Sequence, residues 1–265
     1  MKIKQNIPNA ITCCNLLCGC FAIVKALEGN LVMAAYLVGI AAVLDFLDGF
    51  AARLLNVNSP IGKDLDSLAD MVTFGIVPGM VIYQLIVISN NLVIDGPAIQ
   101  GWSVYPTFSN PENSGTYLLK YFAFIIPVFS AIRLAKFNND KKQSDSFIGL
   151  PTPANAILVC SFPLILYVSN DDTYMIYTAC LVNPYFLAAT SIIMSLLLVS
   201  NIPLFALKFN TFGWAGNRIR YIFLALSALM LVFLQFVGIP LIVMLYILIS
   251  LLNNLTKKTE NSVTN

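Results

Sequence analysis

Residues 31–55 read LVMAAYLVGIAAVLDFLDGFAARLL, and this apolar run decides the fold. A helix that crosses a bilayer needs about 20 mostly apolar residues, and the run is long enough. It also carries Asp45, Asp48 and Arg53 inside the apolar stretch. A carboxylate within a membrane span costs at least about 2.5 kcal/mol on insertion scales, so it needs a compensating partner. The run therefore predicts a transmembrane helix that contributes to a polar site.

The composition excludes most soluble architectures. Of the 265 residues, 58% are hydrophobic and only 11% are charged, whereas an ordinary soluble domain is about 25% charged. Disordered chains lack apolar residues, so the same values exclude disorder. The chain contains no histidine, which excludes Ser-His-Asp and Cys-His catalysis and every His-ligated metal site. A net charge of +2 is too balanced to indicate a nucleic-acid partner.

Apolar stretches of membrane-spanning length recur along the whole chain. They predict an all-α, polytopic transmembrane helix bundle that forms one integral membrane domain, residues 1–265. We expect the catalytic core in about residues 7–205 and two additional spans in about residues 219–254. The eight expected spans are residues 9–28, 31–56, 63–89, 117–138, 153–170, 183–200, 219–237 and 239–254.

The distribution of positive charge indicates how the bundle is oriented. All of the 15 Lys and Arg residues except Lys25 and Lys120 lie on one side of the expected spans. Loops rich in Lys and Arg stay in the cytoplasm, and the bias agrees with an even number of spans. We therefore expect a multi-pass protein of the cell membrane, with both termini and the acidic ends of the second and third spans in the cytoplasm.

The polar residues of the second span fall on one helical face. At about 100° per residue, Asp45, Asp48, Gly49, Ala52 and Arg53 lie within one sector of the helix. The two small residues would let a bulky ligand approach the backbone beside the carboxylates. The planar guanidinium of Arg53 suits a phosphate or diphosphate.

The third span adds Asp66 and Asp70, which are four residues apart and share a face. A short loop makes the two spans antiparallel neighbours, so four carboxylates converge on one spot. Oxygen-ligated Mg²⁺ or Mn²⁺ would neutralise them, and two such ions can clamp the oxygens of a phosphoryl displacement. The alternative is a set of acids that line a wet cavity, as in ion transporters and proton relays.

The spacing from Asp45 to Asp70 is D-x2-D-G-x2-A-R-x8-G-x3-D-x3-D. This pattern resembles the signature of the CDP-alcohol phosphatidyltransferase family at all eight fixed positions. The resemblance implies an integral membrane enzyme that displaces CMP from a CDP-linked lipid. It also implies two divalent cations, Mg²⁺ or Mn²⁺, held among the aspartates.

The resemblance assigns a role to each fixed position. Asp70 would be the general base for the acceptor hydroxyl, and Asp64, which falls between fixed positions and is expected to face away, is excluded. The implied metal ligands are Asp45, Asp48, Asp66 and Asp70. The implied contacts to the cytidine diphosphate part are Gly49, Ala52, Arg53 and Gly62.

Three other segments are similar to the serine-using branch of this family. The first is the pattern P-N-x2-T-x2-N-x3-G that starts at Pro8. The others are AIRLAKFN at residues 131–138 and FIGLPTPAN at residues 147–155, with Lys136 standing where that branch has Arg. The segment SNIPLF at residues 200–205 adds weaker support.

Polar residues in two of these segments are candidate binding groups. Asn9 and Thr12 share a face of the first span and could line the nucleotide pocket; helix capping and interhelical hydrogen bonding are the alternatives. Arg133 could bind the carboxylate of serine or a lipid phosphate; its alternative is a cytoplasmic anchor.

The resemblance therefore predicts transfer of a phosphatidyl group from CDP-diacylglycerol to the hydroxyl of L-serine, with membrane lipid as the surroundings. A sibling enzyme that uses glycerol phosphate or inositol phosphate is one alternative. A cation transporter with an acidic site is the alternative from another class, although it leaves the Gly49, Ala52 and Arg53 spacing unexplained. A homodimer is compatible with the sequence.

Overall fold

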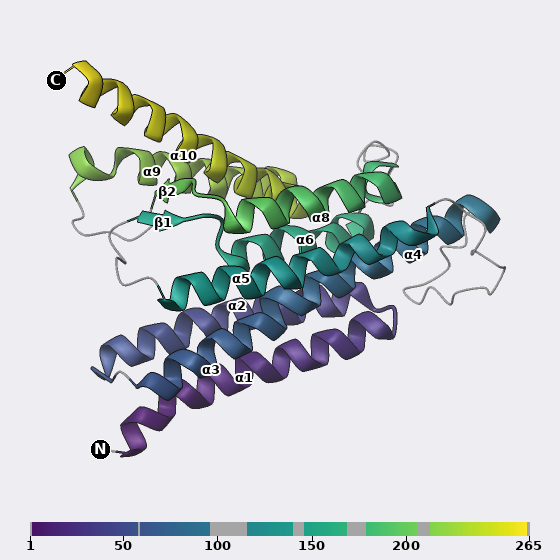
Figure 1. The fold of residues 1–265 in the computed structure, drawn as a ribbon, viewed down its shortest axis with the longest axis horizontal. Coiled ribbons are helices and arrows are strands. Elements are labelled where there is room, and N and C mark those ends of the chain that lie inside the picture. The colour runs from purple at the N-terminus through teal and green to yellow at the C-terminus, as the bar shows by residue number, and fades with distance from the viewer. Residues whose placement is uncertain are drawn as a thin grey trace.

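Long apolar helices make up most of the computed structural model, and the C-terminal helix is inclined to the helices near the N-terminus (Figure 1). The structure describes residues 2–57, 59–95, 116–139, 146–168, 179–205 and 213–263. The helices in chain order are α1 (Lys2–Leu27), α2 (Leu31–Leu54), α3 (Pro60–Asp70), η1 (Met71–Ile76), α4 (Val77–Asp95), η3 (Tyr117–Phe124), α5 (Ile125–Asn139), α6 (Thr152–Val168), α8 (Pro184–Val199), α9 (Trp214–Leu234), η5 (Gln235–Val237) and α10 (Gly238–Val263). Two short strands, β1 (Ser146–Ile148) and β2 (Pro203–Phe205), accompany them.

These helices confirm the predicted all-α polytopic class. Five helical stretches among the described residues are long and apolar enough to cross a membrane: Asn6–Leu27, Leu31–Leu54, Pro60–Asn90, Tyr117–Asn139 and Asn217–Asn254. The last of these includes most of α9 and most of α10. Helices α6 and α8 are apolar but shorter, with 17 and 16 residues. The number of spans stays a prediction.

The break between the last two helices lies earlier than the sequence indicates. We expected the second of the two additional spans to begin after residue 238. In the structure α9 ends at Leu234, and Gln235 takes a positive φ of 48°. The single turn η5 then leads directly into Gly238, where a Cβ atom would lie 2.7 Å from the carbonyl oxygen of Met230. Close backbone contact at that glycine therefore sets the sharp reversal.

Two short connections reverse the chain between α1 and α2 and between α2 and α3, and α1 packs against both of the helices that follow it. Between α1 and α2, Gly29 has a φ of 77°, and Asn30 caps α2 by accepting a hydrogen bond from the Met33 amide at 3.1 Å. Between α2 and α3, Ser59 accepts from the Gly62 amide at 2.9 Å, and Pro60 occupies the first helical turn. The predicted short loop between the second and third spans is thus confirmed.

The predicted span 63–89 contains a feature that the sequence did not reveal. The helical stretch from Pro60 to Asp95 is interrupted by the π-helical segment η1, which starts immediately after Asp70. π-Helical turns occur frequently at functional sites. Here the extra residue per turn changes the helical face between Asp70 and the apolar residues of α4.

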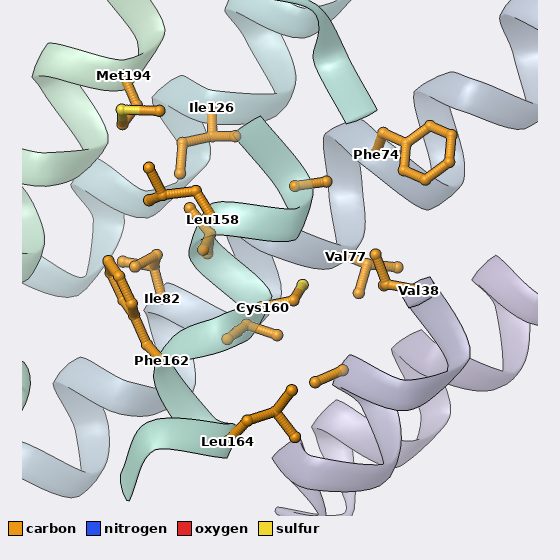
Figure 2. Close-up of a cluster of buried hydrophobic side chains, with 14 of the residues drawn as sticks. Val38, Phe74, Val77, Ile82, Ile126, Leu158, Cys160, Phe162, Leu164 and Met194 are labelled. Carbon is orange, nitrogen blue, oxygen red and sulfur yellow. The ribbon is translucent and has the colours of Figure 1, made fainter. Parts of the chain in front are cut away.

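Small residues let the helices approach one another closely around η1. A Cβ atom at Gly19 of α1 would lie 2.4 Å from Thr73 Oγ1, and one at Gly75 would lie 3.2 Å from Ser130 Cβ of α5. Such contacts are the usual means of packing helices in a membrane. Figure 2 shows the apolar side of the same core, where η1, α4, α5, α6 and α8 contribute side chains to one buried cluster.

The short strands β1 and β2 pair in an antiparallel manner, with Ser146 opposite Phe205 and Ile148 opposite Pro203. Both strands lie between the predicted spans. Gly149 follows β1 with a φ of 76°, and its amide donates to the Ile202 carbonyl at 2.9 Å. The pair fixes the start of α6 against the end of α8.

One end of the bundle holds the four aspartates; we call it the aspartate end, defined by Asp45, Asp48, Asp66 and Asp70. The start of α1 and the end of α10 both lie at this end (Figure 1). Helices α2 and α5 end here, and α3 and α6 begin here.

Candidate active site

Three carboxylates meet where α2 ends and α3 begins. Asp45, Asp48 and Asp66 each present an oxygen atom, and these oxygen atoms all lie within 4.8 Å of one another. Asp48 is buried, and the other two are partly buried. The convergence predicted from helical periodicity is therefore present, and its spacing suits a divalent cation with oxygen ligands.

Asp70 lies beside this group rather than within it. It is one helical turn beyond Asp66 and is 8% exposed. Its carboxyl group is within hydrogen-bonding reach of Asp45 and accepts a hydrogen bond from Asn15 Nδ2 at 3.5 Å. Asp64, by contrast, is exposed and lies outside the group of three carboxylates.

Helix α1 supplies hydrogen-bond donors to two of the aspartates. Thr12 Oγ1 donates to Asp48 Oδ2 at 2.7 Å, and Asn15 contacts Asp70 as described above. These residues are three apart and therefore share a face of α1. Thr73 of η1 in turn donates to the Asn15 carbonyl at 3.3 Å. This contact fixes how far α1 is shifted along its axis relative to the site.

A cavity of about 320 Å³ opens beside the carboxylates. This volume lies at the lower end of the range that is usual for small-molecule sites. Its walls come from the start of α1, the end of α2, the turn between α2 and α3, and the start of α3. The lining residues are Pro8, Asn9, Thr12, Asp45, Asp48, Gly49, Ala52, Val57, Ser59, Gly62, Lys63 and Asp66.

Most of the predicted nucleotide-contacting residues line this cavity: Asn9, Thr12, Gly49, Ala52 and Gly62. A Cβ atom at Gly49 would meet nothing within 4 Å, so this wall is open to a ligand. A Cβ atom at Gly62 would lie 2.9 Å from both Asn9 Oδ1 and Ser59 Oγ. Gly62 therefore permits close packing of α3 on α1.

The two predicted arginines lie outside the residues that line the cavity. Arg53 is exposed, and its Nε donates to the Gly49 carbonyl at 3.0 Å. Arg133 is buried on α5, where its Nε donates to the Leu150 carbonyl at 3.4 Å. The guanidinium of Arg133 also lies 5.5 Å from the centre of the Phe137 ring.

The cavity includes a cation that sequence reasoning missed. Lys63 lines it, and its Nζ donates to the Asn138 carbonyl at 2.9 Å. Asn138 Nδ2 also donates to Ser67 Oγ at 2.8 Å, so this pair of contacts joins α3 to the end of α5. The available signal in the sequence was that Lys63 directly follows Gly62, one of the predicted contacts.

Comparison with known proteins identifies the family. The family description "CDP-alcohol phosphatidyltransferase" matches residues 5–252. The chain belongs to the CDP-alcohol phosphatidyltransferase family. The match extends beyond the signature on α2 and α3 to the last helix, so the additional C-terminal helices fall within the CDP-alcohol phosphatidyltransferase match as well.

Several curated relatives of this CDP-alcohol phosphatidyltransferase carry more specific names. A CDP-diacylglycerol–serine O-phosphatidyltransferase from Helicobacter pylori is 36% identical over 169 residues, which cover 63% of this chain and 59% of the relative. One of the same name from Bacillus subtilis is 31% identical over 189 residues, covering 68% of this chain and 90% of the relative. An archaetidylserine synthase from Methanothermobacter thermautotrophicus is 26% identical over 177 residues, covering 65% and 64%. The chain thus spans about three fifths of the Helicobacter relative's length.

Proposed function

We propose that this chain transfers the phosphatidyl group of CDP-diacylglycerol to the hydroxyl group of L-serine, giving phosphatidylserine and CMP. The acceptor oxygen forms a bond to the phosphorus atom that carries diacylglycerol, and the bond from this phosphorus to the CMP oxygen breaks. The hydroxyl proton passes to a base, and CMP leaves with the electron pair. The names of the Helicobacter and Bacillus relatives support this reaction.

One structural observation carries the proposal: three carboxylates meet within 4.8 Å beside a cavity whose glycine wall is open. A cavity lined by acids repels a diphosphate unless cations stand between them. No ion pair joins any of the four aspartates to an Arg or Lys of the described residues. The donor set consists of hard carboxylate oxygens, which Mg²⁺ and Mn²⁺ prefer.

We therefore propose that Asp45, Asp48 and Asp66 hold a divalent cation, with Asp70 and Asp45 placed to contribute to a second. When bound, such ions stabilise the negative charge that develops on the diphosphate. Thr12 orients Asp48 through its hydrogen bond, and Asn15 does the same for Asp70. Asp70 is buried beside the three carboxylates and accepts the proton of the acceptor hydroxyl.

The small residues and the two arginines complete the proposed site. Gly49 and Ala52 leave room for the nucleotide against the backbone of α2. The Nε of Arg53 is held by the Gly49 carbonyl, and we assign its terminal nitrogen atoms to a phosphate oxygen. Arg133 is assigned to the acceptor. Its burial favours this role, because a residue that only anchors the helix in the cytoplasm would be solvated.

We also propose that the aspartate end faces the cytoplasm of a cell membrane. This end collects both ends of the described chain and the polar cavity. It is also the end to which the Lys and Arg residues are biased in the sequence. The water-soluble acceptor and nucleotide would then enter from the cytoplasm while the acyl chains stay in hydrocarbon.

The test is CMP release by the full chain in detergent or lipid, with CDP-diacylglycerol and Mn²⁺ or Mg²⁺. L-Serine, glycerol 3-phosphate and inositol phosphate are offered in parallel. We expect turnover with L-serine that exceeds the others at least about tenfold, because one mismatched charged group in a buried site costs that much. Turnover with a different acceptor instead would make the chain a sibling enzyme. Cation flux in liposomes without nucleotide would favour a transporter.

A further inference from the structure

A second group of polar side chains lies deeper in the bundle and outside the cavity described above. Ser130, Asn155 and Asn15 are each 0% exposed. Four of their side-chain polar atoms have no hydrogen-bond partner within the described ranges: Ser130 Oγ, Asn155 Nδ2, Asn155 Oδ1 and Asn15 Oδ1. A buried polar atom without a partner costs about 1–3 kcal/mol. Four such atoms in an apolar bundle therefore indicate a place for a polar ligand.

The core packing puts Ser130 and Asn155 in one layer. Ile126 of α5 and Leu158 of α6 belong to the same buried apolar cluster (Figure 2). Ser130 follows Ile126 by four residues, and Asn155 precedes Leu158 by three. Because α5 ends and α6 begins at the aspartate end, each polar residue lies about one turn closer to the aspartates than its apolar neighbour.

The π-helical segment η1 connects this layer to Asp70. Both α5 and α6 pack against η1, and a Cβ atom at Gly75 would lie 3.2 Å from Ser130 Cβ. Asp70 immediately precedes η1, and Asn15 joins the layer through its hydrogen bond to Asp70. Asp70 thus contacts Asn15 of α1, and the segment η1 that follows Asp70 contacts α5 and α6.

Arg133 brings a positive charge to the same place. It follows Ser130 by three residues and so shares its face of α5. Its Nε donates to the Leu150 carbonyl, and the Asn155 amide donates to the neighbouring Pro151 carbonyl at 3.2 Å. Arg133 therefore lies against the residues that begin α6. No carboxylate of the described chain lies within ion-pair distance of it.

The available groups match the two charged ends of an amino acid. The Arg133 guanidinium, the Ser130 hydroxyl and the Asn155 Nδ2 amide are donors, which suit a carboxylate. The Asn155 and Asn15 Oδ1 atoms are acceptors, which suit an ammonium group. Asp70 lies on the side where a hydroxyl of the same molecule would be presented. Glycerol 3-phosphate and inositol phosphate carry no ammonium group, so they offer these two acceptors only uncharged hydroxyl donors, whose hydrogen bonds are weaker.

We propose that Ser130 and Asn155, together with Arg133, form the subsite that recognises the carboxylate and ammonium groups of the acceptor. The subsite selects a hydroxyl-bearing α-amino acid and holds its hydroxyl toward Asp70. This inference rests on the proposed function, because it specifies how that reaction chooses its acceptor.

The experiment compares Ser130→Ala and Asn155→Ala with the unaltered full chain. The serine dependence and the CDP-diacylglycerol dependence of CMP release are measured separately. We expect each substitution to raise the KM for L-serine about tenfold to a hundredfold, which is the loss of one hydrogen bond to a charged group. The KM for CDP-diacylglycerol is expected to stay within about twofold, and this value also reports that the variant is folded.

Ser161→Ala is the matched control. Ser161 is also buried on α6, but its hydroxyl donates to the Leu158 carbonyl at 2.6 Å within its own helix. The serine KM of this variant is expected to match that of the unaltered chain. If Asn155→Ala does not fold, Asn155→Ser retains a polar group of smaller size and replaces it in the comparison.

Ethanolamine, which lacks the carboxylate, provides a second readout. The unaltered chain is expected to prefer L-serine over ethanolamine, and Ser130→Ala is expected to reduce this preference at least about tenfold. Unchanged serine KM values and an unchanged preference in both variants would overturn the subsite. An equal rise in the KM for L-serine and in the KM for CDP-diacylglycerol would also overturn it, because it would indicate a structural role. If the unaltered chain releases no CMP with L-serine, the proposed function fails, whatever the variants do.

Discussion

Thr12 shows how one hydroxyl connects a helix outside the aspartate signature to the carboxylates. Its Oγ1 donates to Asp48 Oδ2 at 2.7 Å from the neighbouring helix. We predict that Thr12→Val, which keeps the shape but removes the donor, lowers kcat/KM for CMP release about tenfold or more, since a hydrogen bond to a charged group is worth about 1.5–3 kcal/mol. The apparent affinity for Mn²⁺, measured by titration, is expected to fall with it.

Thr12→Ser is the control for this prediction, because it retains the hydroxyl group. It is expected to keep most of the activity. Equal losses in Thr12→Val and Thr12→Ser would show that the methyl group, and therefore packing, matters instead of the hydrogen bond.

The aspartates differ in a way that single substitutions can separate. Asp48 and Asp66 belong to the group within 4.8 Å, whereas Asp64 is exposed on the same short helix as Asp66. We predict that Asp48→Asn and Asp66→Asn each reduce CMP release about a hundredfold or more, as loss of a charge-stabilising group in an active site does. Asp64→Asn is expected to stay within about twofold. A comparable loss in Asp64→Asn would contradict the assignment of the site, and activity assays of the three purified variants decide it.

The helical elements determine which of these residues meet, and small residues determine how closely. Gly19 and Gly39 form a matched pair: a Cβ atom at Gly19 would lie 2.4 Å from Thr73 Oγ1, while one at Gly39 would meet nothing within 4 Å. We predict that Gly19→Ala destabilises the chain by about 1–3 kcal/mol through overpacking and lowers activity by displacing α1. Gly39→Ala is expected to be neutral or slightly stabilising. Thermal unfolding in detergent measures both, and equal effects would contradict the packing argument.

Helix capping at the far end of the bundle supplies a stability prediction that is independent of the site. Asn30 caps α2 through the Met33 amide, a full helix length from the aspartates. Asn30→Ala is expected to cost about 1 kcal/mol and to lower the Tm by about 2–4 °C. The KM values for both substrates should not change. Asn30→Asp, which can still cap, is expected to restore the Tm; a variant with altered KM values would show that the turn influences the site.

The sequence predicted the parts of the structure that follow from local periodicity. Asp45 and Asp48 share a helical face because the α-helix repeats every 3.6 residues, and the short turn at Ser59 brings Asp66 opposite them. By contrast, the pairing of β1 with β2 joins segments more than fifty residues apart. The π-helical η1 could not be foreseen either, because its geometry depends on the packing of α1 and α5 around Thr73 and Gly75.

Ser130 and Asn155 are polar residues whose role likewise could not be predicted from the sequence. In the sequence they are a serine in an apolar helix and an asparagine after a Pro-rich loop. From either sequence context alone, a residue that contacts a ligand cannot be distinguished from one that makes an ordinary interhelical hydrogen bond. Only the packing of α5 and α6 against η1 shows that both are fully buried and lack partners in the part of the chain that the structure describes.

For the whole molecule, both ends of the described chain and the carboxylate cavity lie at the aspartate end (Figure 1). If that end faces the cytoplasm, as the bias of Lys and Arg indicates, epitope tags placed before Met1 and after Asn265 should both resist protease added to intact cells. Both tags should be cleaved once the membrane is permeabilised. Cleavage of one tag in intact cells would require an odd number of crossings, and cleavage of both would reverse the orientation. The first outcome would place one terminus outside the cytoplasm. The second would place the aspartate end outside as well, so that CDP-linked lipid and CMP would have to be handled away from the cytoplasmic nucleotide pool.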